Sequence, residues 1–279
     1  MKINRILVPM DYSPCAENAF RSALLLAKKT GSSIHIVSVT HVPHLHAEAV
    51  GATSIIQPLL QEYHEQLDEQ FEKLISTNDV GEIEVCNTKY NAPLHNAIYS
   101  CTIQNECDLI ITGTKSQHGW LTNLLGSNSM DMVERAKIPV LVIPESCESV
   151  TFKKLGVAID YSDFDDPNIL APLRDFATVN FSQLCFLNVT SKQHKLFVYD
   201  DIKLSISNYF NGLKQSYHTF TDNRKLEDIL MEAISDLELD MLFMLPKNHT
   251  VLDRLINKSH TKAMASKTDK PMMTIHEKK

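Results

Sequence analysis

Two stretches that lie far apart in this chain repeat each other. Ile6–Ser13 is a short apolar run that ends in Asp-Tyr-Ser, and Leu155–Ser162 has the same form in the second half of the chain. Two further pairs follow at a shorter common offset: Cys107–Thr112 with Leu239–Met244, and Ile138–Ile143 with Lys270–Ile275. A period this long indicates a duplicated domain rather than a solenoid of small repeats.

The chain is long enough for two ordinary domains, because 279 residues divide into two units of common domain size. Hydrophobic residues make up 43%, so each unit can bury a core without disulfide or metal staples. We expect a first copy at residues 1–146 and a second at residues 151–279, with the boundary in the polar stretch Pro144–Thr151. The later pairs have the shorter offset, so the second copy must be shorter than the first in its middle.

Short apolar runs alternate with helical patterns in both copies. Ser13 is a suitable N-cap for a helix that Gly31 ends. Further helices are expected at Gln57–Ser76, Ala92–Ile103 and Ser127–Ala136. The expected strands are Arg5–Met10, Ser33–Val39, Glu82–Thr88, Cys107–Thr112 and Val140–Ile143, then Lys154–Ile159, Gln183–Val189, Gln215–Thr219, Met241–Leu245 and Met272–Ile275.

This alternation predicts a parallel sheet with helices on both faces and right-handed crossovers. In open sheets of this kind, ligands bind beyond the carboxyl ends of the strands, where the strand order reverses. Two such ends carry polar or small residues. The first strand ends at Asp11, and the fourth ends at Gly113.

Charge and composition exclude several classes of function. The net charge of −7, with no strongly basic stretch, argues against sequence-independent nucleic-acid binding. The apolar runs are far shorter than the roughly 20 residues of a membrane span, and the first residues lack the apolar stretch of a secretory signal. We therefore expect a cytoplasmic protein. The six cysteines contain no C-x-x-C, which favours reduced, mostly buried thiols.

The segment after the fourth strand could hold a phosphate. Gly126 and Ser127 stand where the fourth helix is expected to begin, and unpaired amides at a helix N-terminus attract anions. Glycines at Gly113 and Gly126 allow close backbone approach, while Ser127, Ser129 and Lys115 add donors or positive charge. A Gly-Ser before a helix is by itself more typical of an ordinary capped helix.

The spacing of these residues resembles the universal stress protein family. Nucleotide-binding members carry Gly-x2-Gly-x9-Gly-Ser/Thr after strand four, and this chain has Gly113-x2-Ser116-x9-Gly126-Ser127. Val8–Ser13 and Ile138–Pro144 are also similar to the family. The resemblance covers the first copy and, more weakly, the second. It implies two tandem Rossmann-like (adenine nucleotide alpha hydrolase-like) domains, each with a five-stranded parallel sheet of order 3-2-1-4-5.

The resemblance also implies which residues would hold a nucleotide. Asp11 would lie by the adenine and ribose, and Val39 would flank the adenine. Ser116 replaces a glycine, and a positive φ there would cost about 1 kcal/mol, which weakens a site without abolishing it. The complete predicted site is Pro9, Asp11, Val39, Gly113, Thr114, Lys115, Ser116, Gly126, Ser127, Asn128 and Ser129.

The second copy keeps Asp160 but loses the loop. When Asp240 is aligned with Asp108, the residues Leu245, Asn248 and Lys258 take the places of Gly113, Ser116 and Gly126. Side chains then stand where backbone would have to meet phosphate, and Pro246 lacks an amide donor. We expect the second copy to be a structural partner that binds no ATP.

The preferred hypothesis is a stress-response or regulatory protein that binds ATP or a related adenine nucleotide, with Mg²⁺ as its counterion, in the first copy only. A nucleotide would then bias the loop Thr40–Ile56. A nucleotide-free scaffold and a slow ATPase are the alternatives. No dedicated base or metal ligand supports the ATPase, so we expect no enzyme and no catalytic residue.

Fifth strands commonly pair in this family. The strands at Val140–Ile143 and Met272–Ile275 could therefore pair within the chain as an intramolecular pseudo-dimer, and a homodimer is a further possibility.

The histidines His41, His44 and His46 follow the second strand closely enough to suggest a metal site. Their spacing matches none of the specific zinc patterns, which usually draw ligands from a second element. The sequence therefore favours a polar loop that can cover the nucleotide site, and we predict no metal site.

Overall fold

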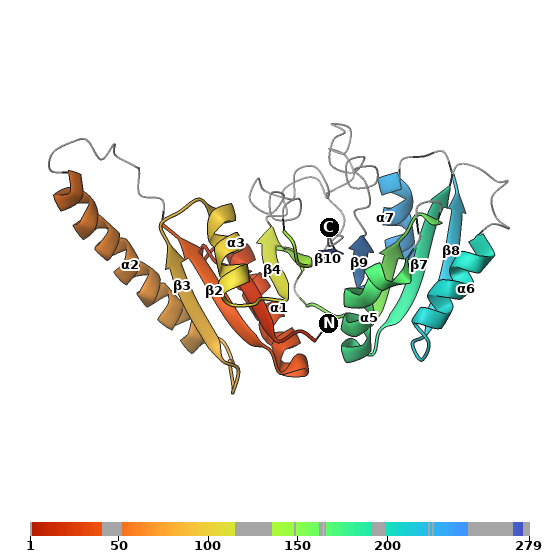
Figure 1. The fold of residues 1–279 in the computed structure, drawn as a ribbon, viewed down its shortest axis with the longest axis horizontal. Helices are drawn as coiled ribbons and strands as arrows, with labels where there is room; N and C mark the ends of the chain where they lie inside the picture. The colour runs from red at the N-terminus through yellow and green to blue at the C-terminus, as the bar shows by residue number, and fades with distance from the viewer. Residues whose placement is uncertain are drawn as a thin grey trace. The chain divides into compact units, whose positions relative to one another are not determined.

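The computed structural model describes residues 2–40, 52–114, 136–147, 149–161, 164, 166–190, 199–222, 224, 226–244 and 270–275. Contacts divide the chain into two compact units. The first unit is Ile3–Thr112, and the second comprises Met1–Lys2 with Gly113–Lys279. Each unit is an α/β arrangement around a mostly parallel sheet (Figure 1).

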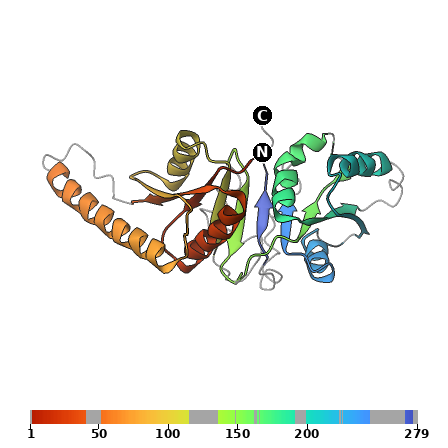
Figure 2. The ribbon, with the colours of Figure 1, turned by 90° about the horizontal axis from the view of Figure 1, so that it is seen from below.

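The sheet of the first unit has the order β3-β2-β1-β4, with every described pair parallel. Its strands are β1 (Arg5–Pro9), β2 (Ser33–Val39), β3 (Val85–Tyr90) and β4 (Leu109–Thr114), of which the last two residues belong to the second unit. Figure 2 shows helices on both faces: α1 (Pro14–Thr30) and α2 (Ala52–Thr77) cover one face, and α3 (Leu94–Gln104) covers the other.

Local chemistry explains the bounds of α1. The Ser13 side chain accepts a hydrogen bond from the Ala16 amide, and Pro14 follows at the first helical position. Gly31 ends the helix at φ 71°, a left-handed conformation that glycine adopts without strain, and its amide donates to the Ala27 carbonyl. These are the start and end signals that the sequence predicted.

The second unit contains five parallel strands in the order β8-β7-β6-β9-β10. In chain order this is 3-2-1-4-5, as predicted for each copy. α5 and α6 cover one face, and α7 covers the other (Figure 2). The elements are β6 (Lys154–Ala158), the short 3-10 helix η2 (Pro167–Leu170), α5 (Ala171–Asn180), β7 (Gln183–Thr190), α6 (Asp200–Tyr209), β8 (Gln215–Thr221), α7 (Leu226–Asp236), β9 (Met241–Met244) and β10 (Met272–Thr274).

One further strand, β5 (Val140–Pro144), joins this sheet and pairs antiparallel with β10. The register places Met272, Met273 and Thr274 opposite Val142, Leu141 and Val140. All six residues are buried, so the pairing protects two strand edges. The two runs expected from the sequence to pair therefore do so.

The repeat and the contacts place the boundary between the two halves of the chain differently. The repeat placed the boundary between the copies in Pro144–Thr151, whereas the contacts divide the chain at Thr112 and Gly113. β5 pairs with β10, and the contacts group it with the second unit although it closes the first repeat in sequence. The proposed sequence boundary stays a prediction.

In both copies, an aspartate just before the fourth strand accepts hydrogen bonds from two backbone amides at the start of the first strand. The Asp108 carboxylate accepts hydrogen bonds from the amides of Asn4 (2.7 Å) and Arg5 (3.1 Å). Its counterpart Asp240 accepts from the amides of Lys153 and Lys154, each at 2.9 Å. Charge-assisted bonds of this kind are stronger than neutral ones, which gives the two aspartates a structural role.

Several bounds differ from the sequence expectations. β3 begins at Val85 rather than Glu82, because the Ile83 amide closes a turn onto the Val80 carbonyl (3.1 Å). α2 begins at Ala52 rather than Gln57 and contains Pro58 inside the helix. β4 extends further than predicted, to Thr114. The predicted helix at Ser127–Ala136 lies, apart from its last residue, outside the described residues.

Candidate functional site

The candidate site begins where β1 ends. The Asp11 side chain is exposed, and its Oδ1 accepts hydrogen bonds from the Ser13 amide (3.0 Å) and the Ser13 hydroxyl (2.5 Å). Tyr12 between them adopts φ 57°, the left-handed region that a non-glycine residue rarely enters. Within residues 2–40 and 52–114, the structure gives Oδ2 of Asp11 no partner. The carboxylate is thus oriented by its own turn and keeps one oxygen for a ligand.

Tyr12 connects this turn to α2. Its hydroxyl donates a hydrogen bond to the Leu67 carbonyl at 3.2 Å, and burial raises the pKa of Tyr12 above its ordinary value. On β3, the Lys89 ammonium contacts the Asp68 carboxylate (2.6 Å) and the His64 carbonyl (3.2 Å). These contacts hold α2 against the same end of the sheet as Asp11.

Pro9 and Val39 lie beside Asp11 at the ends of β1 and β2. Pro9 is opposite Val37 in the parallel register, and the Met10 amide donates to the Val37 carbonyl (2.8 Å). Val39 is half-buried and is the last residue of β2. The structure therefore brings together Pro9, Asp11 and Val39 at the carboxyl edge of the first sheet.

Gly113 and Thr114 form the end of β4. Thr114 is buried, and its Oγ1 has no hydrogen-bond partner among the described residues. Its carbonyl accepts a hydrogen bond from the Glu145 amide at 2.9 Å, just after β5. A buried hydroxyl without a partner costs free energy, so a donor or acceptor that reached it would stabilise the protein.

The rest of the predicted site falls outside the described part of the chain. This applies to Lys115, Ser116, Gly126, Ser127, Asn128 and Ser129. It applies equally to the histidines at 41, 44 and 46 and to Leu245, Asn248 and Lys258 of the second copy. In the described residues, no group of three or more His, Cys, Asp or Glu side chains could hold a metal ion.

The same tripeptide has different surroundings in the second copy. Tyr161 is 1% exposed, and its amide donates to Oδ1 of Asn188 on β7 (3.4 Å). Its ring packs on Tyr199 at 5.3 Å, and burial raises the pKa of its hydroxyl. In the described residues, neither the Tyr161 hydroxyl nor Nδ2 of Asn188 has a hydrogen-bond partner. The tyrosine that reaches a helix in the first copy is enclosed in the second.

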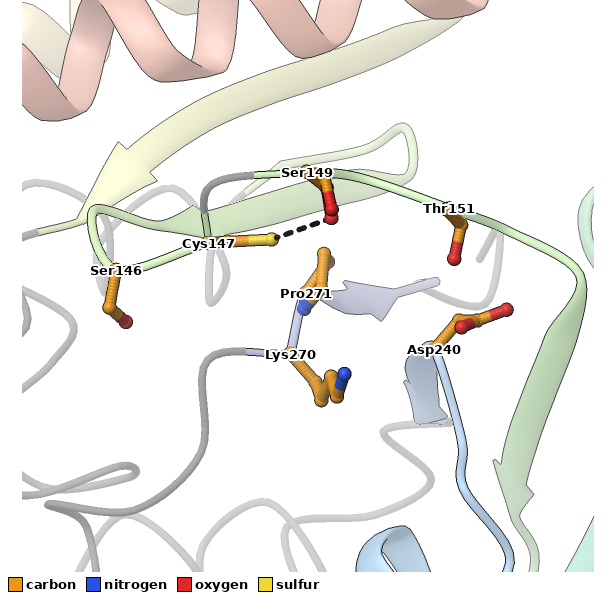
Figure 3. A pocket seen from close by; sticks show the side chains of 7 residues that line it. All are labelled: Ser146, Cys147, Ser149, Thr151, Asp240, Lys270 and Pro271. Carbon is orange, nitrogen blue, oxygen red and sulfur yellow. Dashed lines mark hydrogen bonds between the residues drawn. The ribbon is translucent and has the colours of Figure 1, made fainter.

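A hollow of about 310 Å³ lies elsewhere in the second unit (Figure 3). Its lining comes from segments just before β6, β9 and β10 and just after β5, the edge opposite the carboxyl ends of the parallel strands: Ser146, Cys147, Ser149, Thr151, Asp240, Lys270 and Pro271. Asp240 already accepts two backbone amides, and the Cys147 thiol donates to the Ser149 carbonyl at 3.7 Å. Asp240 and Cys147 thus use their polar groups to hold the backbone around this hollow.

Two residues outside the predicted site, Ser13 and Tyr12, shape the turn that carries Asp11. Ser13 was expected to cap α1, and it also holds the Asp11 carboxylate. Tyr12 was given no role, although it fixes the turn to α2. The Asp-x-Ser spacing was a signal for the first contact, because Asp side chains often bond the amide two residues on. The contact of Tyr12 with Leu67 had no sequence signal.

No described helix is long and apolar enough to cross a membrane. As expected, the cysteines are free and five of the six are buried, with Cys86 exposed.

Comparison with known proteins identifies a family and a fold. A family model described as "Universal stress protein family" matches residues 2–144, half of the chain. Over the full length, the structure is similar to a universal stress protein from Archaeoglobus fulgidus, with 16% identity, 99% of each chain covered and a TM-score of 0.70. A putative universal stress protein from Pseudomonas aeruginosa matches at 15% identity over 98% of this chain and 93% of that chain, with a TM-score of 0.58.

The fold is also similar to that of a protein with a different description. The cytoplasmic domain of a prokaryotic cation chloride cotransporter matches with 9% identity, 98% of this chain and 95% of that chain covered, and a TM-score of 0.55. At this identity the likeness concerns the fold alone. Function therefore has to be argued from the residues at the carboxyl ends of the strands.

Proposed function

The chain belongs to the universal stress protein family, and on this premise we propose that its first copy binds an adenine nucleotide while the second copy binds none. The proposed ligand is ATP or a related nucleotide, which brings its own Mg²⁺. The protein acts as a stress-response or regulatory module that senses the nucleotide rather than as an enzyme.

The observation that carries this proposal is the presentation of Asp11. Its carboxylate is fixed by Ser13 through Oδ1, it is exposed, and it stands at the carboxyl edge of a parallel sheet. Ribose hydroxyls donate hydrogen bonds to such carboxylates in nucleotide-binding α/β proteins. Val39, half-buried at the end of β2, offers an apolar surface for a base.

The phosphate side of the proposal rests on the sequence of the loop after β4. Gly126 and Ser127 supply the amides of a helix N-terminus, which bind phosphate because they point outward with the positive end of the helix dipole behind them. The Thr114 hydroxyl, which has no partner among the described residues, stands at the entrance of this loop. Ser116 in place of the second glycine predicts modest affinity, since a positive φ there would cost about 1 kcal/mol.

The second copy also has an exposed aspartate, Asp160, but differs in the residues around it. Tyr161 is enclosed beside Asn188 and Tyr199, while Tyr12 keeps its place at a half-exposed turn. Leu245 and Lys258 occupy the sequence positions of Gly113 and Gly126. We propose that this copy supports the first one through the β5–β10 pairing, as an intramolecular counterpart of a dimer.

A matched pair of substitutions tests the proposal by calorimetric titration with ATP. Asp11→Asn keeps the shape and an acceptor for Ser13 but removes the charge, so we expect affinity to fall about tenfold, in line with about 1.4 kcal/mol for a charged hydrogen bond. Asp160→Asn makes the same change in the second copy and should leave ATP binding as in the wild type.

Wild-type protein that shows no heat with millimolar ATP and no thermal shift would refute nucleotide binding. The alternative function, a nucleotide-free scaffold of the same fold, would then be supported. Ser116 in place of the glycine would mark the loss of the nucleotide site in the first copy. Equal losses in Asp11→Asn and Asp160→Asn would refute the assignment to the first copy.

A further inference from the structure

A buried cluster of thiols lies in the first unit, between α3 and the sheet. Cys101 stands in the last turn of α3 and Cys107 just before β4; they are 0% and 5% exposed. The Cys107 thiol points to the Cys101 carbonyl with a sulfur–oxygen distance of 3.9 Å. The side chain of Cys107 thus packs against the backbone of Cys101, and the two thiols lie close enough for each to affect the ionisation of the other.

Two polar side chains complete the cluster. Nδ2 of Asn105 donates to the Cys101 sulfur at 3.2 Å. His35 on β2, 7% exposed, is held by a 2.7 Å hydrogen bond between its Nε2 and Oγ1 of Thr88 on β3, and it is near enough to affect the ionisation of Cys101. Of the two sulfurs, Cys101 is therefore the one that accepts a hydrogen bond from a neighbouring side chain.

From this arrangement we propose that Cys101 and Cys107 form a dithiol that hydroperoxides oxidise to a disulfide, with Cys101 as the attacking sulfur and Cys107 as the resolving thiol. The proposal is independent of nucleotide binding.

The ionisation of the two thiols agrees with these roles. The neighbouring Cys107 thiol, followed by His35 and Asn105, holds the pKa of Cys101 well below the ordinary thiol value. The Cys101 thiol, and then burial, raises the pKa of Cys107. A thiolate is the nucleophilic form of cysteine, so Cys101 reacts first.

The reaction balances without any other reductant. The Cys101 thiolate attacks one oxygen of the hydroperoxide and breaks the O–O bond, which yields a sulfenic acid and, after protonation, water or an alcohol. Cys101 is then neutral, and the negative charge that raised the pKa of Cys107 is gone. The Cys107 sulfur attacks the Cys101 sulfur, the S–S bond forms, and the sulfenic oxygen leaves as water with the Cys107 proton. The two sulfurs together give two electrons to the peroxide.

Both thiols are buried, so a small oxidant would reach them by local opening of the turn that ends α3. Glu106 adopts φ 48° in this turn, which costs about 1 kcal/mol for a non-glycine residue. Short-range backbone bonds hold the turn: the Asn105 amide to the Cys101 carbonyl (3.0 Å), Glu106 to Ile103 (3.3 Å) and Cys107 to Thr102 (3.0 Å). Local opening of such a segment needs less free energy than unfolding of the sheet.

Peptide mapping tests the proposal on the intact protein. Trypsin cleaves after Lys89 and Lys115, so both cysteines fall in one peptide, 90–115, while the exposed Cys86 falls in the peptide 74–89. The folded, reduced protein is treated with one equivalent of hydrogen peroxide, alkylated under denaturing conditions and digested. We expect the peptide 90–115 to lose the mass of two hydrogens and to escape alkylation, before Cys86 is modified.

Cys86 is the internal control, because burial and then Glu84 raise its pKa although it is exposed. The variant Cys107→Ser should instead accumulate a Cys101 sulfenic acid that dimedone traps, and Cys101→Ser should leave the peptide 90–115 reduced. If Cys101 and Cys107 of the wild type are still alkylated at a peroxide dose that oxidises Cys86, the proposal is overturned. Disulfide formation only after addition of denaturant would overturn it as well.

Discussion

The tripeptide Asp-Tyr-Ser occurs after the first strand of each copy and has two different structural outcomes. Tyr12 adopts a left-handed backbone conformation, reaches the Leu67 carbonyl and leaves Asp11 exposed. Tyr161 is buried against Asn188 and Tyr199 and leaves its hydroxyl without a partner in the described structure. A motif that occurs twice in one chain can therefore place its tyrosine at a half-exposed turn in one copy and in the core in the other.

The largest expected difference between the copies concerns the phosphate loop. Gly126→Asp places a carboxylate at the proposed phosphate position, where like-charge repulsion and the added side chain should lower ATP affinity by more than about 100-fold. Lys258→Asp makes a matched change in the second copy and should leave affinity within about twofold. Isothermal titration with ATP measures both. Loss of binding in Lys258→Asp would mean that the second copy contributes to the site.

The tyrosines should respond in opposite directions to loss of the hydroxyl. Tyr12→Phe removes the hydrogen bond to Leu67 and should cost about 1 kcal/mol of unfolding free energy. Tyr161→Phe removes a buried hydroxyl for which the described residues offer no partner, so it should raise stability by about 1 kcal/mol. Chemical denaturation gives both values, and losses of equal size would contradict the contrast.

The dependence of folding stability on pH above about 10 also distinguishes the two tyrosines. Burial raises the pKa of Tyr161 in the folded state, so above a pH of about 10 the unfolded chain releases this proton first. Folding stability must then fall as pH rises through that range. Tyr161→Phe should flatten this fall, as measured by denaturant unfolding at several pH values; an unchanged slope would show that Tyr161 is not the buried acid described here.

The smallest expected effects concern the ends of the first helix in each copy. α1 ends at Gly31 with φ 71°, whereas α5 ends at Phe181 with φ 53°, and Phe181 is 91% exposed. Phe181→Gly should stabilise the protein by up to about 1 kcal/mol by relieving the left-handed strain, and Gly31→Ala should destabilise it by a similar amount. Thermal unfolding tests the pair. A destabilised Phe181→Gly would indicate that the ring makes contacts that the structure does not describe.

The parallel α/β architecture could be predicted from the alternation of elements, and the strand order from the resemblance to the universal stress protein family. The pairing of β5 with β10 was likewise expected from that family, in which fifth strands commonly pair. The start of β3 was placed too early, at Glu82, since Ile83 was taken as a strand residue although its amide closes a turn. Edge strands have weak patterns, which makes such bounds hard to place.

The site was only partly predictable. Pro9, Asp11 and Val39 lie at the strand ends as expected, because a buried strand followed by a polar residue marks its own end. The enclosure of Tyr161 could not be predicted, since it depends on Asn188 and Tyr199, which belong to later segments of the chain. The placement of His35 near Cys101 likewise depends on how α3 packs on β2.

The number of nucleotides bound per chain tests the account most directly. Native mass spectrometry of the purified protein with excess ATP reads this number from the mass of the complex. We predict one ATP per chain, lost in Gly126→Asp and retained in Lys258→Asp. Two ATP per chain would show that the second copy also binds, and an unliganded chain at millimolar ATP would show that neither copy does.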